Sequence, residues 1–151
     1  SAAYSSDGSR IVSTGADGTV RQWEAKSGRA IGESLRGHQR GVWSAAYSRD
    51  GSRIVSAGAD GTVRQWEAKS GRAIGEPLRG HQGIVKAAAY NSDGSRIMSA
   101  GRDGTVRQWL PAWSDPIGLV CRSLRAHQSL LSPTTDIEQE ARSTCQRWGW
   151  R

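Results

Sequence analysis

The stretch "SAGADGTVRQWEAKSG" at residues 56–71 decides the architecture, because residues 13–28 repeat it almost unchanged as "STGADGTVRQWEAKSG". A third copy begins at Ser99 as "SAGRDGTVRQW" and changes after Trp109 to "LPAWSDPIG". The tryptophans of the three copies are each 43 residues apart. A constant period of this length indicates the duplication of one structural unit.

Each unit predicts four short strands joined by tight turns. In the second copy "VWSAAYS", "SRIVSAG" and "TVRQWEA" alternate in polarity, and the run "RAIGEPLRGH" leads to the next copy. The strands are separated by Asp-Gly pairs such as Asp50-Gly51 and Asp60-Gly61, and glycine tolerates the positive φ of hairpin turns. A small sheet of this kind cannot bury both faces alone, so we expect the sheets to stack radially as a propeller.

The stretch "LRGHQRGVWSAAYSRDGSRIVSAGADGTVRQWEAKSG" resembles a WD repeat, with Gly-His near its start, an Asp before the third strand and a Trp closing that strand. The resemblance covers residues 1–109. One departure is the residue after the Trp, which is Glu24 and Glu67 in the first two copies but Leu110 in the third.

This resemblance implies an all-β fold of WD-repeat β-propeller blades, three four-stranded antiparallel blades that form an incomplete ring per chain, with a short α-helical C-terminal tail. The expected boundaries are 1–36 for an N-terminally truncated first blade, 37–79 for the second, 80–120 for a third with an atypical outer strand, and 121–151 for the tail.

The resemblance also implies a hydrogen-bond relay in each blade, in which Asp orients His, His bonds Ser, and Ser reaches the indole N–H. Its residues are Ser13, Asp17 and Trp23 in the first copy, which lacks the His; His38, Ser56, Asp60 and Trp66 in the second; and His81, Ser99, Asp103 and Trp109 in the third. The same residue types could form a catalytic triad. However, the set of Ser, His and Asp recurs in both complete copies, whereas catalysis needs only one site. No phosphate loop, "HExxH" or paired carboxylates occur either, so we expect no enzyme activity, catalytic residue, cofactor or metal.

Copies this similar make their differences informative. The second and third copies differ at a loop that precedes the first strand and at the loop between the second and third strands. In the resembling fold both loops open on one rim, where family members usually bind proteins or peptides. The predicted partner-binding residues are Arg40, Trp43, Ala59, Ile84, Lys86 and Arg102. Neutral drift at exposed positions is the alternative explanation.

The net charge of +7 favours an acidic protein or peptide as the partner. The alternative is nucleic-acid binding through an Arg-rich surface, on which Arg10, Arg53 and Arg96 recur. No apolar run approaches the roughly 18 residues of a membrane span. The sequence therefore predicts a non-catalytic interaction scaffold with no membrane partner.

The repeat fails after Trp109. Val120, Leu124, His127 and Leu131 form the stripe of an amphipathic helix, and residues 136–148 predict a second helix. A competing alignment makes residues 116–120 the outer strand of the third blade. Cys121 and Cys145 fit buried thiols in a reducing cytoplasm, with a disulfide as the alternative. The tail also has a weaker resemblance to the C-terminal extension of large bacterial WD-repeat proteins, some with an upstream signalling NTPase, which suggests a sensor part of such a protein.

Three blades do not close a ring, because propellers typically have about 4–8. Ser1 aligns with Ser44 inside the first strand of a copy. That alignment favours a fragment of a longer propeller. The alternative is a homo-oligomer in which several chains complete one self-assembling ring.

Overall fold

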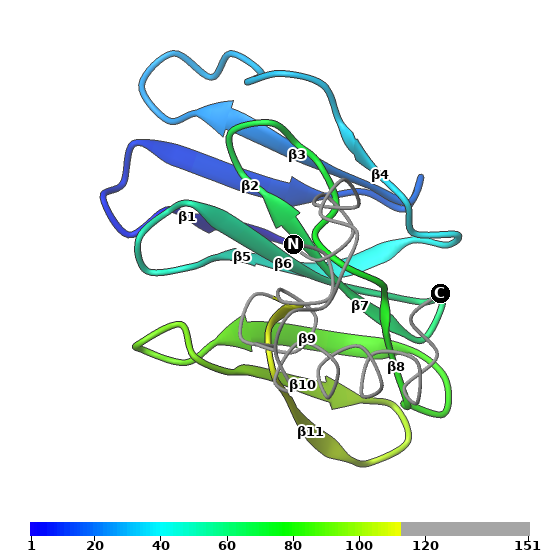
Figure 1. Ribbon diagram of the computed structural model, residues 1–151. Helices are drawn as coiled ribbons and strands as arrows, with labels where there is room; N and C mark the ends of the chain where they lie inside the picture. Colours follow the sequence, from blue (N-terminus) through cyan, green and yellow to red (C-terminus); the bar gives the residue numbers. More distant parts are fainter. Residues whose placement is uncertain (113–151) are drawn as a thin grey trace, which may run out of the picture. The chain divides into compact units, whose positions relative to one another are not determined.

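Three antiparallel β-sheets follow one another along residues 1–112, the part of the chain that the computed structural model describes (Figure 1). The first sheet contains β1 (Ala2–Tyr4), β2 (Arg10–Thr14), β3 (Thr19–Glu24) and β4 (Leu35–Arg36), hydrogen-bonded in that order. The second contains β5 (Val42–Tyr47), β6 (Arg53–Gly58), β7 (Thr62–Glu67) and β8 (Leu78–Arg79). The third contains β9 (Val85–Tyr90), β10 (Ile97–Gly101) and β11 (Val106–Trp109). The prediction of an all-β fold built from small antiparallel sheets is confirmed over these residues.

The turns on either side of β6 show why Asp-Gly pairs separate the strands. Gly51 and Gly61 have φ angles of 67° and 79°, a region that is open to glycine and costly for other residues. Beside Gly51, the carboxylate of Asp50 accepts hydrogen bonds from the hydroxyls of Ser48 and Ser52, each at 2.6 Å. These bonds lower the pKa of Asp50 to about 2. The ionised side chain therefore holds the turn closed.

The outer strand of each four-stranded sheet is shorter than the run "RAIGEPLRGH" suggests. In the second sheet, Ala73 forms one isolated bridge with Trp66, and only Leu78–Arg79 pairs again with β7. Gly75, with a φ of 67°, turns the backbone between these two points, and Pro77 lacks an N–H for the ladder. The outer edge is therefore held by two short contacts.

Several predictions concern residues 113–151, which lie outside the described part. They are the outer strand of the third sheet at 116–120, the helical tail at 121–151, and the state of Cys121 and Cys145. Within residues 1–112, no helix has the length and apolar character needed to cross a membrane.

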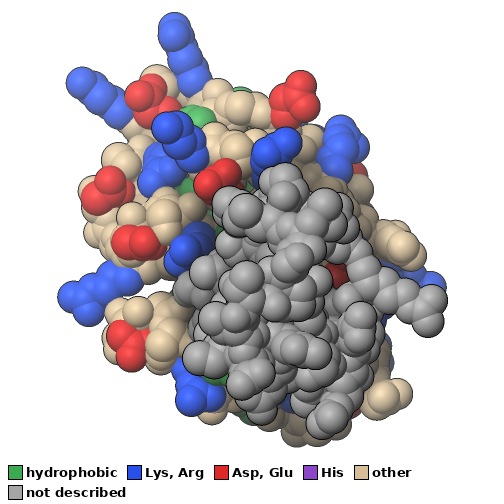
Figure 2. Space-filling view, viewed as in Figure 1, with side chains coloured by type: hydrophobic (Ala, Val, Ile, Leu, Met, Phe, Trp, Pro, Cys, Tyr) green, Lys and Arg blue, Asp and Glu red, His purple; other side chains and the backbone are tan. Residues whose placement is uncertain are grey.

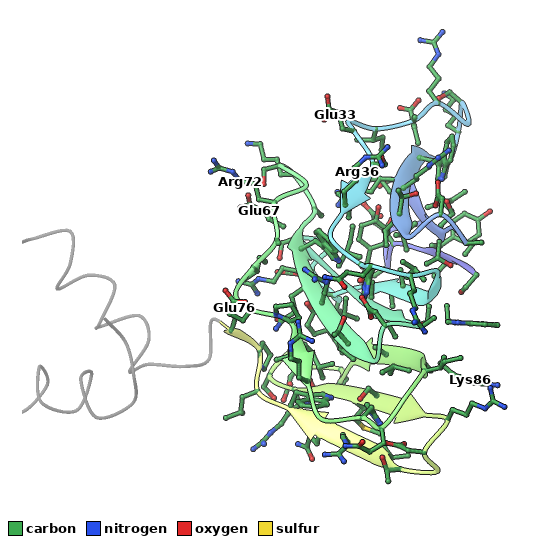
Figure 3. All side chains as sticks on the ribbon, turned by 90° about the vertical axis from the view of Figure 1, so that its right-hand side faces the viewer. Glu33, Arg36, Glu67, Arg72, Glu76 and Lys86 are labelled. Atoms are coloured by element: carbon green, nitrogen blue, oxygen red, sulfur yellow. The ribbon has the colours of Figure 1, made fainter. Side chains whose placement is uncertain are left out.

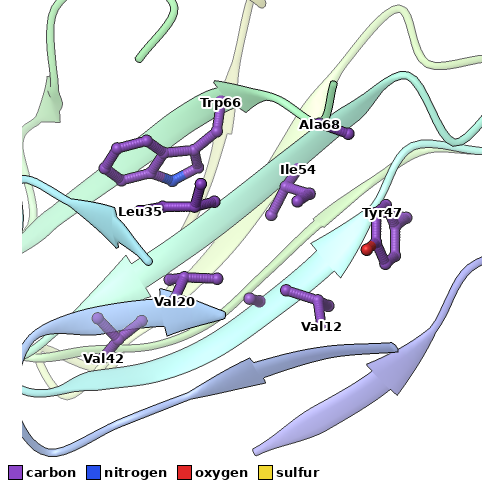
Figure 4. Packing of buried hydrophobic residues seen from close by; sticks show 9 residues of the cluster. Val12, Val20, Leu35, Val42, Tyr47, Ile54, Trp66 and Ala68 are labelled. Atoms are coloured by element: carbon purple, nitrogen blue, oxygen red, sulfur yellow. The ribbon is translucent and has the colours of Figure 1, made fainter. Parts of the chain in front are cut away.

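The first core lies between the first and second sheets (Figure 4). The first sheet contributes Val12, Val20 and Leu35, which are essentially inaccessible to water. The second sheet contributes larger side chains, among them Ile54 from β6 and Trp66 from β7. Each fully buried side chain of this size contributes about 1.5–3 kcal/mol through removal from water.

The second core repeats this arrangement between the second and third sheets. Val55 and Val63 of the second sheet occupy the positions that Val12 and Val20 hold in the first, 43 residues earlier. Ile97 packs against them in the position of Ile54. The second sheet thus buries both of its faces, whereas the first and third sheets each bury one face against it.

Candidate functional site

A chain of hydrogen bonds crosses the second sheet from its surface loop to its core. The Asp60 carboxylate lies 3.0 Å from Nδ1 of His38. Nε2 of His38 lies 2.8 Å from Oγ of Ser56, and Nε1 of Trp66 donates to the same oxygen at 2.8 Å. These four side chains are the ones that the sequence singled out in this copy.

Burial sets the protonation state of this relay. Removal of the imidazole from water lowers the pKa of His38, and the nearby Asp60 carboxylate offsets only part of that effect. A neutral ring donates from Nδ1 to Asp60 and accepts at Nε2 from the Ser56 hydroxyl, whose oxygen accepts from Trp66. Each polar hydrogen of the buried chain then has an acceptor.

Asp60 is the outer anchor of the relay. Burial alone would raise its pKa, but hydrogen bonds from the backbone N–H of Gln39 at 3.0 Å and from the Thr62 hydroxyl at 2.8 Å lower it. The ionised carboxylate thus joins the loop that carries Gln39 to the β6–β7 turn. Gly58 leaves the space for this contact, because a Cβ there would lie 2.5 Å from Nδ1 of His38.

The third sheet has the same relay. Nδ1 of His81 lies 3.0 Å from the Asp103 carboxylate, and the Ser99 hydroxyl lies 2.8 Å from both His81 Nε2 and Trp109 Nε1. The backbone N–H of Gln82 donates to Asp103 and is the main cause that holds the pKa of this carboxyl below its usual range.

The first sheet has only part of this chain. Nε1 of Trp23 donates to Ser13 at 2.8 Å, as in the other sheets. Asp17 instead forms an exposed ion pair with Arg21 at 3.1 Å, because the first copy contains no His. The Asp17 side chain is accordingly 52% exposed, and it also accepts a hydrogen bond from the Thr19 hydroxyl at 2.8 Å.

In the second and third sheets, the relays hold two loops together at one end of the sheet, which we call the rim. In the second sheet these loops are residues 37–41 and 59–61, and in the third sheet residues 80–84 and 102–104. The N–H of Ala59 donates to the carbonyl of Gly41 at 2.8 Å, and the N–H of Arg102 donates to that of Ile84 at 2.8 Å. The two loops that carry the predicted partner-binding residues are thus joined directly.

Two β-bulges place the most prominent side chains of the rim. The ladder between β5 and β6 shifts register around Trp43, and the ladder between β9 and β10 shifts around Lys86. A bulged residue is unpaired and is turned away from the regular alternation. Trp43 is accordingly 51% exposed, and the ammonium group of Lys86 lies 5.9 Å from the centre of its ring. Figure 3 shows Lys86 extending away from the sheets, on the side opposite Glu67 and Arg72.

A groove of about 430 Å³ opens between the rim loops of the second and third sheets. Arg40 and Ala59, both expected at the binding surface, line it together with Gln39, Gly61 and Gly83. Trp43, Ile84, Lys86 and Arg102 are not part of its lining. Gln39 was not predicted from the sequence. Gly83 stands opposite Arg40 where the second and third copies differ, but it was not among the predicted partner-binding residues.

The family model "WD domain, G-beta repeat" matches three segments of the chain, at residues 1–24, 30–67 and 72–109. The chain belongs to the WD-repeat family. Its small sheets are therefore WD-repeat blades, and the regular 43-residue spacing of their tryptophans is that of the repeat. No curated protein matches the chain.

WD-repeat proteins are generally non-enzymatic scaffolds for protein interactions. The geometry agrees with that role in both blades where a triad was conceivable, because Ser56 and Ser99 are buried. Ser56 is fully buried, and its oxygen is already bonded to His38 and Trp66, so a substrate has no access to it. Within residues 1–112, no three His, Cys, Asp or Glu side chains gather where they could hold a metal ion.

A polar contact between the first and second blades was not predicted from the sequence. Tyr47 donates from its hydroxyl to Oε1 of Gln22 at 3.0 Å, and Nε2 of Gln22 donates to the carbonyl of Ala68 at 2.9 Å. Arg10 lies over the Tyr47 ring, 5.2 Å from its centre, and donates to the carbonyl of Gly51 at 2.8 Å. Recurrence of Arg, Gln and Tyr every 43 residues was the available signal.

Proposed function

We propose that the chain is a non-catalytic scaffold whose rim binds a protein or peptide rich in acidic residues. The observation that carries this proposal is the exposed Trp43 ring with the Lys86 ammonium group beside it. Tryptophan and basic residues of this kind anchor protein interfaces. Arg40 and Arg102, both exposed, add positive charge at the same rim.

The relays explain why such a surface would bind efficiently. Asp60 ties the loop of Gln39 to the β6–β7 turn, and Asp103 ties the loop of Gln82 to the β10–β11 turn. Loops that are already ordered lose little conformational entropy when a partner binds. The buried Ser, His and Trp residues therefore support binding without touching the partner.

The arginines that recur along the repeats favour a protein partner over nucleic acid. Arg10 is engaged with Tyr47 and Gly51 of the next blade, and Arg21 pairs with Asp17. On the face in view, Figure 2 shows Lys and Arg side chains interspersed with Asp and Glu around the described part. On this face, charges of both signs alternate (Figure 2), whereas a nucleic-acid interface is typically a continuous basic patch or stripe.

A peptide array tests the proposal. Acidic peptides that contain an aromatic residue should bind, and Trp43→Ala and Arg102→Ala should each weaken that binding about tenfold or more. Arg72→Ala and Lys69→Ala are matched controls, because both residues are exposed at the opposite end of the second blade, and they should leave binding unchanged. Circular dichroism must show an intact fold in every variant.

Loss of binding only in His38→Ala or Trp66→Ala, accompanied by melting, would contradict the rim assignment. Binding that is equal for acidic and basic peptides would contradict the acidic partner. Preferential binding of RNA or DNA, with a steep dependence on salt, would favour the nucleic-acid alternative instead. A cytoplasmic location and a place in a bacterial signalling protein stay predictions of the sequence.

A further inference from the structure

The two outer blades of the described part expose faces that resemble the two halves of its internal interfaces. The face of the first blade away from the second carries Tyr4, Ile11 and Trp23, and Tyr4 is 68% exposed. The face of the third blade away from the second carries Met98 and Val106, which are 51% and 66% exposed. Large apolar side chains of this kind, grouped on one face, mark an interaction surface.

The interfaces between the blades indicate which kind of surface each exposed face can pack against. At the contact between the first and second blades, Val12 and Val20 pack against Tyr47, Ile54 and Trp66. The contact between the second and third blades repeats this pattern with residues 43 positions later. Val55 and Val63 are followed 43 positions later by Met98 and Val106. Tyr4, Ile11 and Trp23 lie 43 positions before Tyr47, Ile54 and Trp66.

We propose that a second copy of this chain covers these faces, with the third blade of one copy packed head-to-tail on the first blade of the other. In this contact Met98 and Val106 take the places of Val12 and Val20. Tyr4, Ile11 and Trp23 take the places of Tyr47, Ile54 and Trp66. Because the two faces differ, each copy uses both of them, and two copies close one ring.

The ring size supports two copies. Two copies of the described part, with three blades each, make a ring of six, within the typical range of about 4–8. Contacts between unlike faces generate closed rings when the rotation closes and open filaments when it does not. A third copy would exceed the usual range.

A polar contact of the first internal interface can also form at the proposed one, although the amide of Gln65, the equivalent residue of the second blade, makes no hydrogen bond at the second interface. Gln22 bonds the Tyr47 hydroxyl and the Ala68 carbonyl across the internal contact, and the equivalent groups are Gln108 of one copy with Tyr4 and Ala25 of the other. Gln108 is exposed. In the ring its Oε1 accepts a hydrogen bond from the Tyr4 hydroxyl, and its Nε2 donates one to the Ala25 carbonyl. The proposed contact therefore includes a polar pairing equivalent to that of the first internal interface, in addition to its apolar residues.

Sedimentation equilibrium of the whole chain tests the proposal without any partner. From about 1 µM to about 1 mM, the range over which a moderate dimer forms, the mass should approach twice the 16.3 kDa of one chain. Val106→Glu and Tyr4→Glu should each give the mass of one chain. Trp43→Glu, an exposed aromatic at the rim, is the matched control and should keep the wild-type mass.

Mixing the two blocked variants identifies the geometry. Tyr4→Glu retains an intact third-blade face and Val106→Glu retains an intact first-blade face, so an equimolar mixture should form a one-to-one pair although each alone does not. Gln108→Ala should weaken the wild-type association about tenfold. A wild-type chain that stays single at every concentration, an open series of larger species, or a mixture that never pairs would each overturn the proposal.

Discussion

The first and second blades carry nearly the same sequence and differ in what surrounds them. Residues 1–34 match residues 44–77 at all but three positions. Yet Tyr4 is 68% exposed and its counterpart Tyr47 only 9%, and Trp66 is buried while Trp23 is half-buried. The comparison teaches that burial in this molecule is decided by the neighbouring blade, because the local sequence is held constant.

The largest expected difference in the free energy of unfolding is between the variants Trp66→Ala and Trp23→Ala. Trp66 is 1% exposed, so its removal should lower the free energy of unfolding by about 3–5 kcal/mol. Trp23→Ala should cost about 1–2 kcal/mol, because that ring is already partly in contact with water. Both are measured by urea denaturation in the Val106→Glu background, which leaves the outer face of the first blade uncovered. Equal losses would show that the blades do not bury each other.

Asp60→Asn and Asp17→Asn compare the stability contribution of a carboxylate bonded to His38 with that of its exposed counterpart in the first blade. The Asp60 side chain is 9% exposed and bonded to His38, whereas the Asp17 side chain is 52% exposed and pairs with Arg21. Loss of the buried charged acceptor should lower the free energy of unfolding by about 1.5–3 kcal/mol. Asp17→Asn should change it little, because exposed ion pairs contribute little. The reverse order would remove the structural role of the relay.

His38 and Asp60 of the second blade should both contribute to the pH dependence of stability. The pKa of His38 lies below its ordinary value of 6.5 in the folded state, so the unfolded state binds more protons in the window just below that value. His38 therefore contributes stability that is present above pH 6.5 and is lost as the pH falls through that window. Asp60 acts in the same direction below pH 3.8, because its folded-state pKa is also lowered.

His38→Gln supplies the check on this prediction. Unfolding measured by urea between pH 8 and pH 5 should show a smaller fall in stability for this variant than for the wild type, because one proton-linked group is gone. An unchanged slope would mean that the imidazole titrates alike in both states.

The sequence predicts the parts of the fold that depend on local chemistry. Asp50-Gly51 and Asp60-Gly61 mark turns because glycine alone adopts their positive φ at low cost, and those turns lie where the structure has them. The relay partners named from the family resemblance, such as His38 and Ser56, are the ones that the structure joins. Both features rest on residues that recur every 43 positions.

Other features depend on packing that no local pattern reports. The bulges at Trp43 and Lys86 arise where two inner strands meet the rim, and no residue type in those strands signals them. The outer strand shrinks to Leu78–Arg79 because Gly75 turns the backbone before it, as Gly32 does before the equally short Leu35–Arg36. The groove beside Arg40 is formed by loops of two blades, so one repeat taken alone does not predict it.

Exchange of the indole N–H protons of Trp23 and Trp66, followed by nuclear magnetic resonance, tests most directly whether the neighbouring blade decides burial. In the Val106→Glu variant, Trp66 should exchange far more slowly than Trp23, although both donate to an equivalent serine at 2.8 Å. In the wild-type chain at high concentration, Trp23 should slow toward Trp66 as a second copy covers it. Equal exchange of the two indoles in Val106→Glu would contradict this explanation.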